Sequence, residues 1–125
     1  MAAISETLNL GDLLKYEAPN LYSRERAIVA AGANLTLGTV VGAVTASAKL
    51  KLLDPAATDG TETAAGVLMN DIDASTADRD DALVIARHAI VARNALVWPE
   101  GMTTEQKTAA EAQLKALGVL VRDAA

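Results

Sequence analysis

Between residues 24 and 98 the sequence is a succession of short apolar segments, each followed by residues that favour turns. The segments are rich in Val, Ile and Thr, and one of them alternates polar with apolar residues, as strands with one buried face do. Gly, Pro and Asp-Gly pairs interrupt them before any reaches the length of an ordinary helix. We therefore expect strands at residues 27–31, 39–45, 49–53, 64–69, 83–87, 90–92 and 95–98.

One helix is predicted after these strands. Thr103 and Gln106 have the spacing of a capping box, so the helix is expected to run from about residue 104 to residue 117. Gly118 then stands where a left-handed C-cap belongs, and residues 119–121 form a last strand. The predicted inner face of the helix consists of Ala110, Leu114 and Leu117.

This order of elements predicts a mainly β fold with a minor α+β character, a small β-barrel-like domain with one C-terminal helix. The chain has 27 alanines among its 125 residues and no Phe, and its aromatic residues are Tyr16, Tyr22 and Trp98. Alanine buries little area, whereas aromatic rings bury the most. Association with other chains is therefore expected to supply part of the stability that such a core lacks.

The charge and cysteine content exclude several classes of partner and site. The formal net charge is −5, and an acidic chain without a basic patch does not favour direct binding of nucleic acid. The absence of cysteine excludes disulfides, thiolate zinc sites and cysteine nucleophiles. No apolar run approaches the ~20 residues that span a bilayer, and the start of the chain lacks the features of a signal peptide. We expect a soluble protein that is made in the cytoplasm and has no membrane partner.

Residues suited to catalysis are few. The one histidine, His88, lies between two expected strands, and the nucleophile elbow Gly-x-Ser-x-Gly does not occur in the chain. A single histidine also makes an ordinary transition-metal site improbable. Gly32, Gly38 and Gly42 match neither a phosphate loop nor a dinucleotide-binding fingerprint, and they fit turns and bulges instead. His88 is therefore interpreted as a plain surface residue.

The acidic segment 71–81 invites comparison with a calcium site. Asp71-x-Asp73-x-Ser75 begins like an EF-hand loop. However, Thr76 replaces the required glycine and Ala82 replaces the bidentate glutamate. We interpret the segment as a solvated acidic loop. The sequence thus predicts no metal site, no cofactor and no enzymatic activity.

Residues 1–23 differ from the remainder, 24–125, which is the predicted β-rich domain. The leucines near the start fit neither a helical nor a strand period, and Gly11 and Pro19 interrupt any long helix. We interpret this segment as an extended N-terminal arm that orders on a partner. The alternative is a short amphipathic helix packed on its own domain. The candidate binding residues are Leu8, Leu10, Leu13, Leu14, Tyr16, Leu21, Tyr22, Ser23, Arg24 and Glu25.

A structural corner is predicted at Trp98 and Pro99. Trp98 is the largest side chain in the sequence, and Pro99 forces the chain out of any sheet at that point. The favoured interpretation is that the ring anchors the following helix to the barrel. The alternative is that Trp98 contacts a partner protein.

Five blocks of sequence, by their order and spacing, resemble one known family. This family is the head decoration proteins of tailed bacteriophages, to which the lambda decoration protein D belongs. The main block is the Asp-Gly-Thr-Glu-Thr-Ala-Ala-Gly-Val-Leu segment at 59–68. Trp98-Pro99-Glu100 and the helix after it form the second. The other blocks lie at residues 22–25, 38–42 and 54–57. The resemblance extends from about Tyr22 to Arg122.

The resemblance implies a β-rich homotrimer that sits at three-fold positions on the outer surface of the expanded virion head. There it would bind the major capsid protein and stabilise the shell against the pressure of the packaged DNA, without catalysis. It also implies that the arm is mobile when free and adds a strand to the capsid protein when bound. On this view, deletion of residues 1–21 is expected to leave fold and trimer intact and to abolish capsid binding.

Composition alone leaves two other classes of protein open. One is a β-rich oligomerisation or adaptor module of another assembly. The other is a small-ligand-binding barrel, which needs a cavity with converging polar groups.

Overall fold

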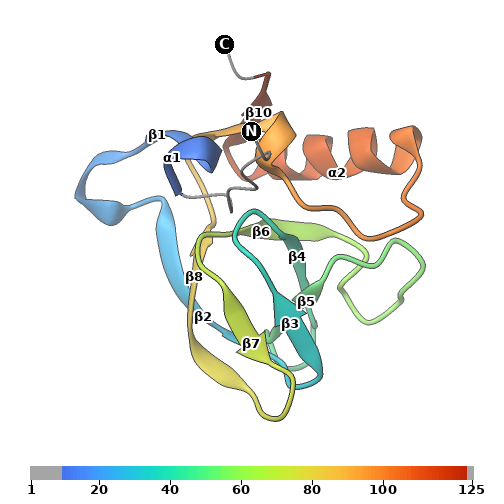
Figure 1. Ribbon diagram of the computed structural model, residues 1–125. Coiled ribbons are helices and arrows are strands. Elements are labelled where there is room, and N and C mark those ends of the chain that lie inside the picture. The colour runs from blue at the N-terminus through green and yellow to red at the C-terminus, as the bar shows by residue number, and fades with distance from the viewer. Residues whose placement is uncertain (1–9, 124–125) are drawn as a thin grey trace, which may run out of the picture.

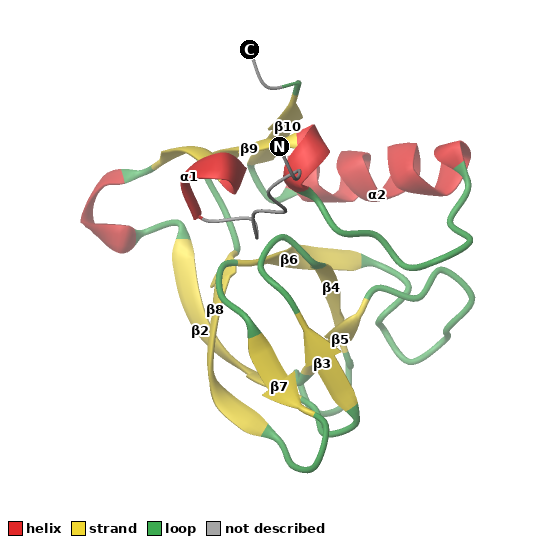
Figure 2. Ribbon diagram, viewed as in Figure 1, coloured by secondary structure: helices red, strands yellow, loops and turns green. Residues whose placement is uncertain are grey.

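A closed five-stranded barrel and a three-stranded sheet above it form two layers (Figure 1). The computed structural model describes residues 10–123. Figure 2 shows that strands and loops dominate and that one long helix lies across the top of the barrel. In chain order the elements are α1 (Leu10–Leu13), β1 (Leu14–Glu17), η1 (Pro19–Leu21), β2 (Arg24–Val29), β3 (Ala33–Leu35), β4 (Val40–Ala43), β5 (Leu50–Leu52), β6 (Ala64–Leu68), β7 (Ile72–Ala74), β8 (Arg79–Ile85), β9 (Ala89–Ala92), η2 (Arg93–Ala95), α2 (Thr104–Ala116) and β10 (Val119–Arg122). The predicted fold class, mainly β with a barrel and one C-terminal helix, is confirmed.

The barrel has the strand order β2-β5-β4-β6-β8. β2 closes it by pairing antiparallel with β8 and parallel with β5. All five strands contribute to one cluster of buried side chains, which therefore fills the barrel interior. The strands β3 and β7 pair with each other and add to the same cluster. The barrel members of the cluster are Val29, Val41, Leu50, Leu68, Ala82 and Val84.

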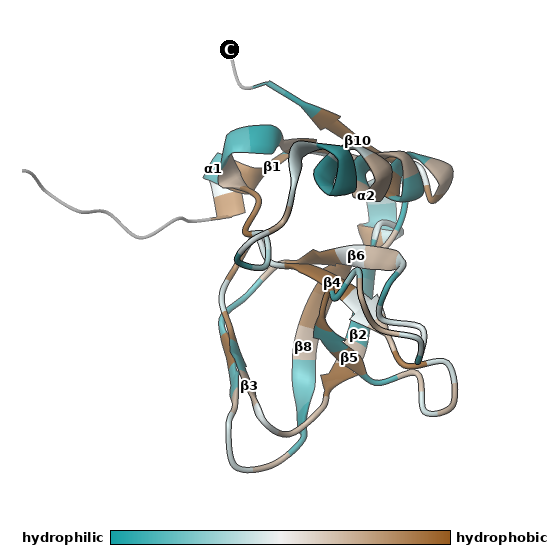
Figure 3. Ribbon diagram, turned by 90° about the vertical axis from the view of Figure 1, so that its right-hand side faces the viewer, coloured by the Kyte–Doolittle hydropathy of each residue, from teal (hydrophilic) through white to brown (hydrophobic). Residues whose placement is uncertain are grey.

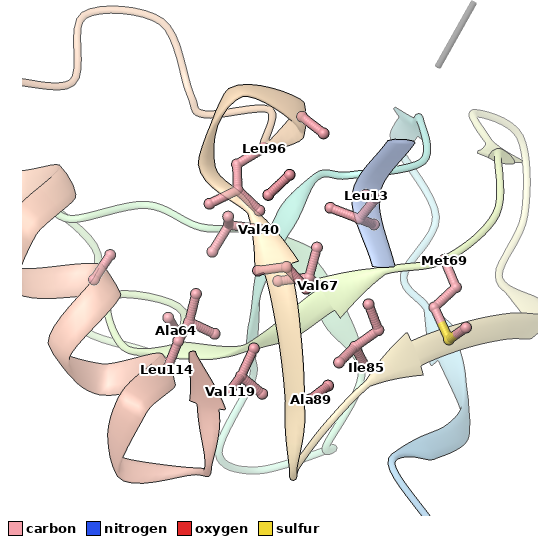
Figure 4. Packing of buried hydrophobic residues seen from close by; sticks show 14 of the residues in the cluster. Leu13, Val40, Ala64, Val67, Met69, Ile85, Ala89, Leu96, Leu114 and Val119 are labelled. Carbon is pink, nitrogen blue, oxygen red and sulfur yellow. The ribbon is translucent and has the colours of Figure 1, made fainter. Parts of the chain in front are cut away.

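The second buried cluster lies between the barrel and the upper layer (Figure 4). Adjacent residues of one strand point to opposite faces, so Val40 and Val67 enter this cluster while the residues after them face the barrel interior. The upper layer is the sheet β1-β9-β10 together with α2. It contributes Val91, Leu114 and Val119, each completely buried.

The helix α2 agrees closely with its prediction. The Thr103 hydroxyl accepts from the Gln106 amide at 3.1 Å, and the Gln106 side chain accepts from the Thr103 amide at 3.0 Å, so the capping box is present. Gly118 has a φ of 90°, as a left-handed C-cap requires. Ala110 and Leu114 are buried, but Leu117 is 38% exposed. Its assignment to the inner face was wrong because the helix ends at Ala116 and Leu117 already forms the cap.

The acidic segment 71–81 is not the continuous loop that the sequence predicted. It contains β7 and the first residues of β8. Ile72 and Ala74 are buried, while Asp71 and Asp73 beside them are exposed. The segment therefore alternates with the period of a strand, and its many carboxylates obscured that pattern. Figure 3 shows the same contrast along β8, which is polar at its start and apolar toward its end.

The strand predicted at residues 95–98 is also wrong. The chain forms the 3₁₀ turn η2 after β9, and only Val97 makes a β-bridge, with Thr39. The Val97 amide donates to the Gly38 carbonyl oxygen at 2.8 Å, and Gly38 has a φ of 92°. A Cβ on Gly38 would lie 2.3 Å from the Ala95 carbonyl oxygen, so the two segments approach too closely for a regular ladder with side chains.

The block at residues 59–61 has a structural role. The Asp59 carboxylate accepts from the Thr61 hydroxyl at 2.6 Å and from the Thr61 amide at 3.1 Å. Gly60 between them has a φ of 109° and lies against β4, where a Cβ would be 2.6 Å from the Ala43 carbonyl oxygen. The hydrogen bonds from Thr61 lower the pKa of Asp59. The block therefore holds the loop before β6 tightly against the barrel.

Trp98 and Pro99 lie between η2 and α2 and are both partly buried. The Trp98 ring packs against the upper core cluster together with Met102, close to the start of α2. This position fits the predicted corner that anchors the helix. The choice between an anchor and a partner contact stays a prediction, because part of the ring is accessible.

Candidate interaction surface

Of the described part of the predicted arm, residues 10–23, the first half is packed on the domain. Leu13 is completely buried in the upper core cluster, and Leu10 and Leu14 pack against the same cluster. β1 pairs antiparallel with β9. The alternative of a short helix packed on its own domain therefore describes residues 10–17 better than an extended arm does. Leu8 lies outside the described residues.

Three large side chains of this segment stay exposed. Tyr16 is 54% exposed on β1, and Leu21 and Tyr22 are 62% and 53% exposed in the turn that follows. Figure 1 shows the turn between β1 and β2 standing out at the side of the molecule. We call Tyr16, Leu21 and Tyr22 the β1–β2 ridge. These exposed side chains are a candidate surface for contact with another protein.

The backbone of the ridge is strained. Asn20 and Leu21 have φ values of 63° and 59°, in the left-handed region. For leucine this conformation costs of order 1–2 kcal/mol, whereas asparagine tolerates it better. The Leu21 side chain on this strained turn is 62% exposed. Strain of this kind at an exposed apolar residue is a feature that functional surfaces share.

Hydrogen bonds at both ends hold the turn in place. Ser23 is completely buried, and its hydroxyl donates to the His88 carbonyl oxygen at 2.7 Å and accepts from the Ala18 amide at 2.9 Å. Arg24 donates to both carboxylate oxygens of Glu17, at 2.8 and 2.6 Å. The ridge is thus a fixed part of the surface.

The Tyr22 ring is fixed by residues from the β8–β9 turn. The Arg87 guanidinium lies 5.2 Å from the ring centre, within the range of a cation–π contact. Arg87 also donates to the Tyr22 carbonyl oxygen at 2.6 Å and forms an ion pair with Glu25. The His88 ring lies 5.2 Å from the Tyr22 ring, centre to centre. Arg87 and His88 lie far from Tyr22 in the sequence, and no local pattern indicated that they meet.

Acid is expected to weaken the ion pair between Arg24 and Glu17. The hydrogen bond from Arg24 lowers the pKa of Glu17 below its usual 4.5, although partial burial acts the other way. The stability that the pair contributes is therefore present above the unfolded pKa and is lost as the pH falls through the folded one. We expect Glu17→Gln to lower the free energy of unfolding by about 1 kcal/mol at pH 7. Urea unfolding at pH 7 and pH 3 should show this difference shrink in acid, and a difference as large at pH 3 as at pH 7 would contradict it.

Residues 10–123 show little of what a metal site, a membrane span, a catalytic histidine or a ligand-binding barrel needs. Among residues 10–123, no group of three or more His, Cys, Asp or Glu side chains is placed to hold a metal ion. Within that range no helix is long and apolar enough to cross a membrane. His88 is exposed and its ring lies against Tyr22. The barrel interior is filled by side chains, which leaves little space there for a ligand.

A filled β barrel with an exposed apolar ridge offers a candidate surface for contact with another protein. Comparison with models of known protein families indicates where such a surface would be used. The model of the bacteriophage lambda head decoration protein D family matches residues 3–119, and the chain belongs to this family. A search of curated proteins finds no significant match. The family consists of structural proteins of phage heads and is not an enzyme family, so the chain has a role in decorating a phage capsid.

Proposed function

We propose that the chain binds the major capsid protein on the outside of the expanded head, as a homotrimer at three-fold positions, and stabilises the shell against the pressure of the packaged DNA. Synthesis in the host cytoplasm is part of the same proposal. The observation that carries it is the β1–β2 ridge, a fixed apolar surface on a member of a head decoration family. A trimer would present three ridges at once, so modest contacts would add up to tight attachment.

The ridge is expected to make the main contact of the folded domain. Burying a leucine or tyrosine side chain contributes about 1.5–3 kcal/mol, so losing one weakens each contact by about tenfold or more. Leu21→Asn with Tyr22→Ser removes both side chains, and asparagine accepts the left-handed backbone at residue 21. We expect this double variant to keep its melting temperature and to lose most of its co-sedimentation with expanded heads.

The matched control is Leu117→Asn, which changes an apolar residue 38% exposed at the end of α2. It should bind heads like the wild type, which would show that loss of binding is specific to the ridge. Equal binding by the ridge variant and the wild type would mean that the capsid contact lies elsewhere on the domain.

Strand addition to the capsid protein is proposed for residues 1–9. The segment precedes α1, and its removal spares Leu13 and β1. We expect deletion of residues 1–9 to leave circular dichroism and oligomeric state unchanged and to lower the occupancy of heads in co-sedimentation. Full occupancy after the deletion would assign attachment to the folded domain alone.

A further inference from the structure

The three-stranded sheet above the barrel has two unlike outer edges. Its strand order is β1-β9-β10, and among the described strands β1 and β10 each pair with β9 alone. An edge strand presents backbone N–H and C=O groups that another strand can bind. Proteins usually protect such edges with proline, bulges or inward-pointing charges. β10, with the sequence Val-Leu-Val-Arg, has neither proline nor a bulge in its pairing with β9, whereas β1 has an irregularity between Leu14 and Tyr16 and is regular from Tyr16 to Glu17.

The outward-facing backbone groups of β10 can be assigned from the ladder. The Ala89 amide donates to the Gly118 carbonyl oxygen at 3.1 Å, and β10 runs parallel to β9. In a parallel pair the groups of alternate residues point to the neighbour, so those of Val119 and Val121 point to the outer edge. A groove of about 280 Å³ lies beside this edge and is lined by Glu111, Ala112, Lys115, Leu120, Val121 and Arg122.

The other edge of the same sheet fits this one in direction and charge. β1 is antiparallel to β9 while β10 is parallel to it, so β1 and β10 run in opposite directions. In an antiparallel pair between two copies, the start of β1 would meet the end of β10. Lys15 would then approach Asp123, and Glu17 at the end of β1 would approach the groove that contains Lys115. Within one chain Asp123 already pairs with Arg93 and Glu17 with Arg24, and the groove also contains Glu111, so these encounters would extend existing ion pairs.

We propose that β10 of one copy pairs antiparallel with β1 of the next, and that three such contacts close the ring of a trimer. The inference rests on the trimeric state proposed above and adds the surfaces that form it. Two unlike edges make a head-to-tail contact, which produces a closed ring when the rotation allows it. Pairing of β10 with a second β10 would instead give a two-fold dimer.

Disulfide trapping tests this arrangement without interference, because the chain has no cysteine. Lys15→Cys is combined with Asp123→Cys in one double variant and with Val121→Cys in another, which covers two registers that differ by two residues. A disulfide requires Cα atoms within about 7 Å, a distance that paired strands satisfy. After mild oxidation of the free protein and of decorated heads, we expect a covalent trimer from at least one double variant, reversed by reductant.

The controls separate this contact from chance collisions. Lys15→Cys combined with Thr58→Cys, in the exposed loop before β6, should give no covalent trimer. A covalent dimer from Asp123→Cys or Val121→Cys alone would overturn the proposal in favour of a β10–β10 contact. Absence of covalent trimer from both double variants, with a trimer found by light scattering, would overturn the proposed surfaces and leave the trimer standing. A monomer both free and on heads would overturn the surfaces and the trimer together.

Discussion

Replacing Leu13 by alanine is expected to lower the free energy of unfolding by about 3–5 kcal/mol. Leu13 is completely buried in the upper core cluster, where it meets side chains from both layers (Figure 4). Removing a fully buried leucine loses its transfer free energy and leaves a cavity that the surrounding chain fills only in part. Urea unfolding followed by circular dichroism measures the loss.

The control is Leu117→Ala, because Leu117 is 38% exposed and should lose much less stability. Deletion of residues 1–21 would remove Leu13 and the whole of β1. We therefore expect that deletion to unfold or severely destabilise the domain, rather than to leave fold and trimer intact as the sequence predicted. A Leu13→Ala variant as stable as wild type would mean that residues 10–17 are a detachable arm after all.

A comparable loss is expected from Gly42→Ala in the barrel. A Cβ at Gly42 would lie 2.6 Å from both the Cα and the carbonyl oxygen of Thr61. These are backbone atoms in a loop that Asp59 holds in place, so no side-chain rotation can relieve the clash. The strand and the loop must separate, and we expect a loss of about 3 kcal/mol or more in the free energy of unfolding.

Gly101→Ala is the matched control for this substitution. Gly101 has a φ of 76°, and no atom lies within 4 Å of the position that a Cβ would take there, so only backbone strain of about 1 kcal/mol is expected. Thermal unfolding of both variants separates steric conflict from backbone strain. Equal stability of Gly42→Ala and wild type would contradict the close packing of the loop on β4.

Local patterns predicted much of the fold. The capping box at Thr103 and the glycine at 118 define α2 through interactions within a few residues, and both are present. Most of the strands also lie where β-branched segments predicted them, because the residues of a strand carry its alternation. The sequence predicted a barrel-like fold but not the strands that close it. The pairing of β2 with both β5 and β8 depends on distant parts of the chain.

The failures have physical causes of their own. The sequence 95–98 is apolar like a strand, but the close approach of Gly38 to Ala95 leaves only one bridge there. Residues 10–17 show no clear period because α1 is one turn long and β1 contains an irregularity between Leu14 and Tyr16. Leu13 could thus be identified as apolar, while its burial follows from tertiary packing.

The exposure of the candidate residues, but not their binding, can be compared with the sequence prediction. Tyr16, Leu21 and Tyr22 are among the residues expected to bind a partner and they are exposed, while their binding stays a prediction. Ser23 and Arg24, predicted alongside them, support the turn through hydrogen bonds. The contribution of Arg87 could not be predicted, because its contact with Tyr22 joins segments that only the folded chain brings together.

The proposed attachment to the head through the β1–β2 ridge is tested most directly by a cryo-EM reconstruction of expanded heads incubated with the protein. We expect trimeric density at the three-fold positions of the outer surface, with the Leu21 and Tyr22 side chains in contact with the major capsid protein. Heads that bind no protein, or that bind it with the β1–β2 ridge facing solvent, would contradict the proposed attachment.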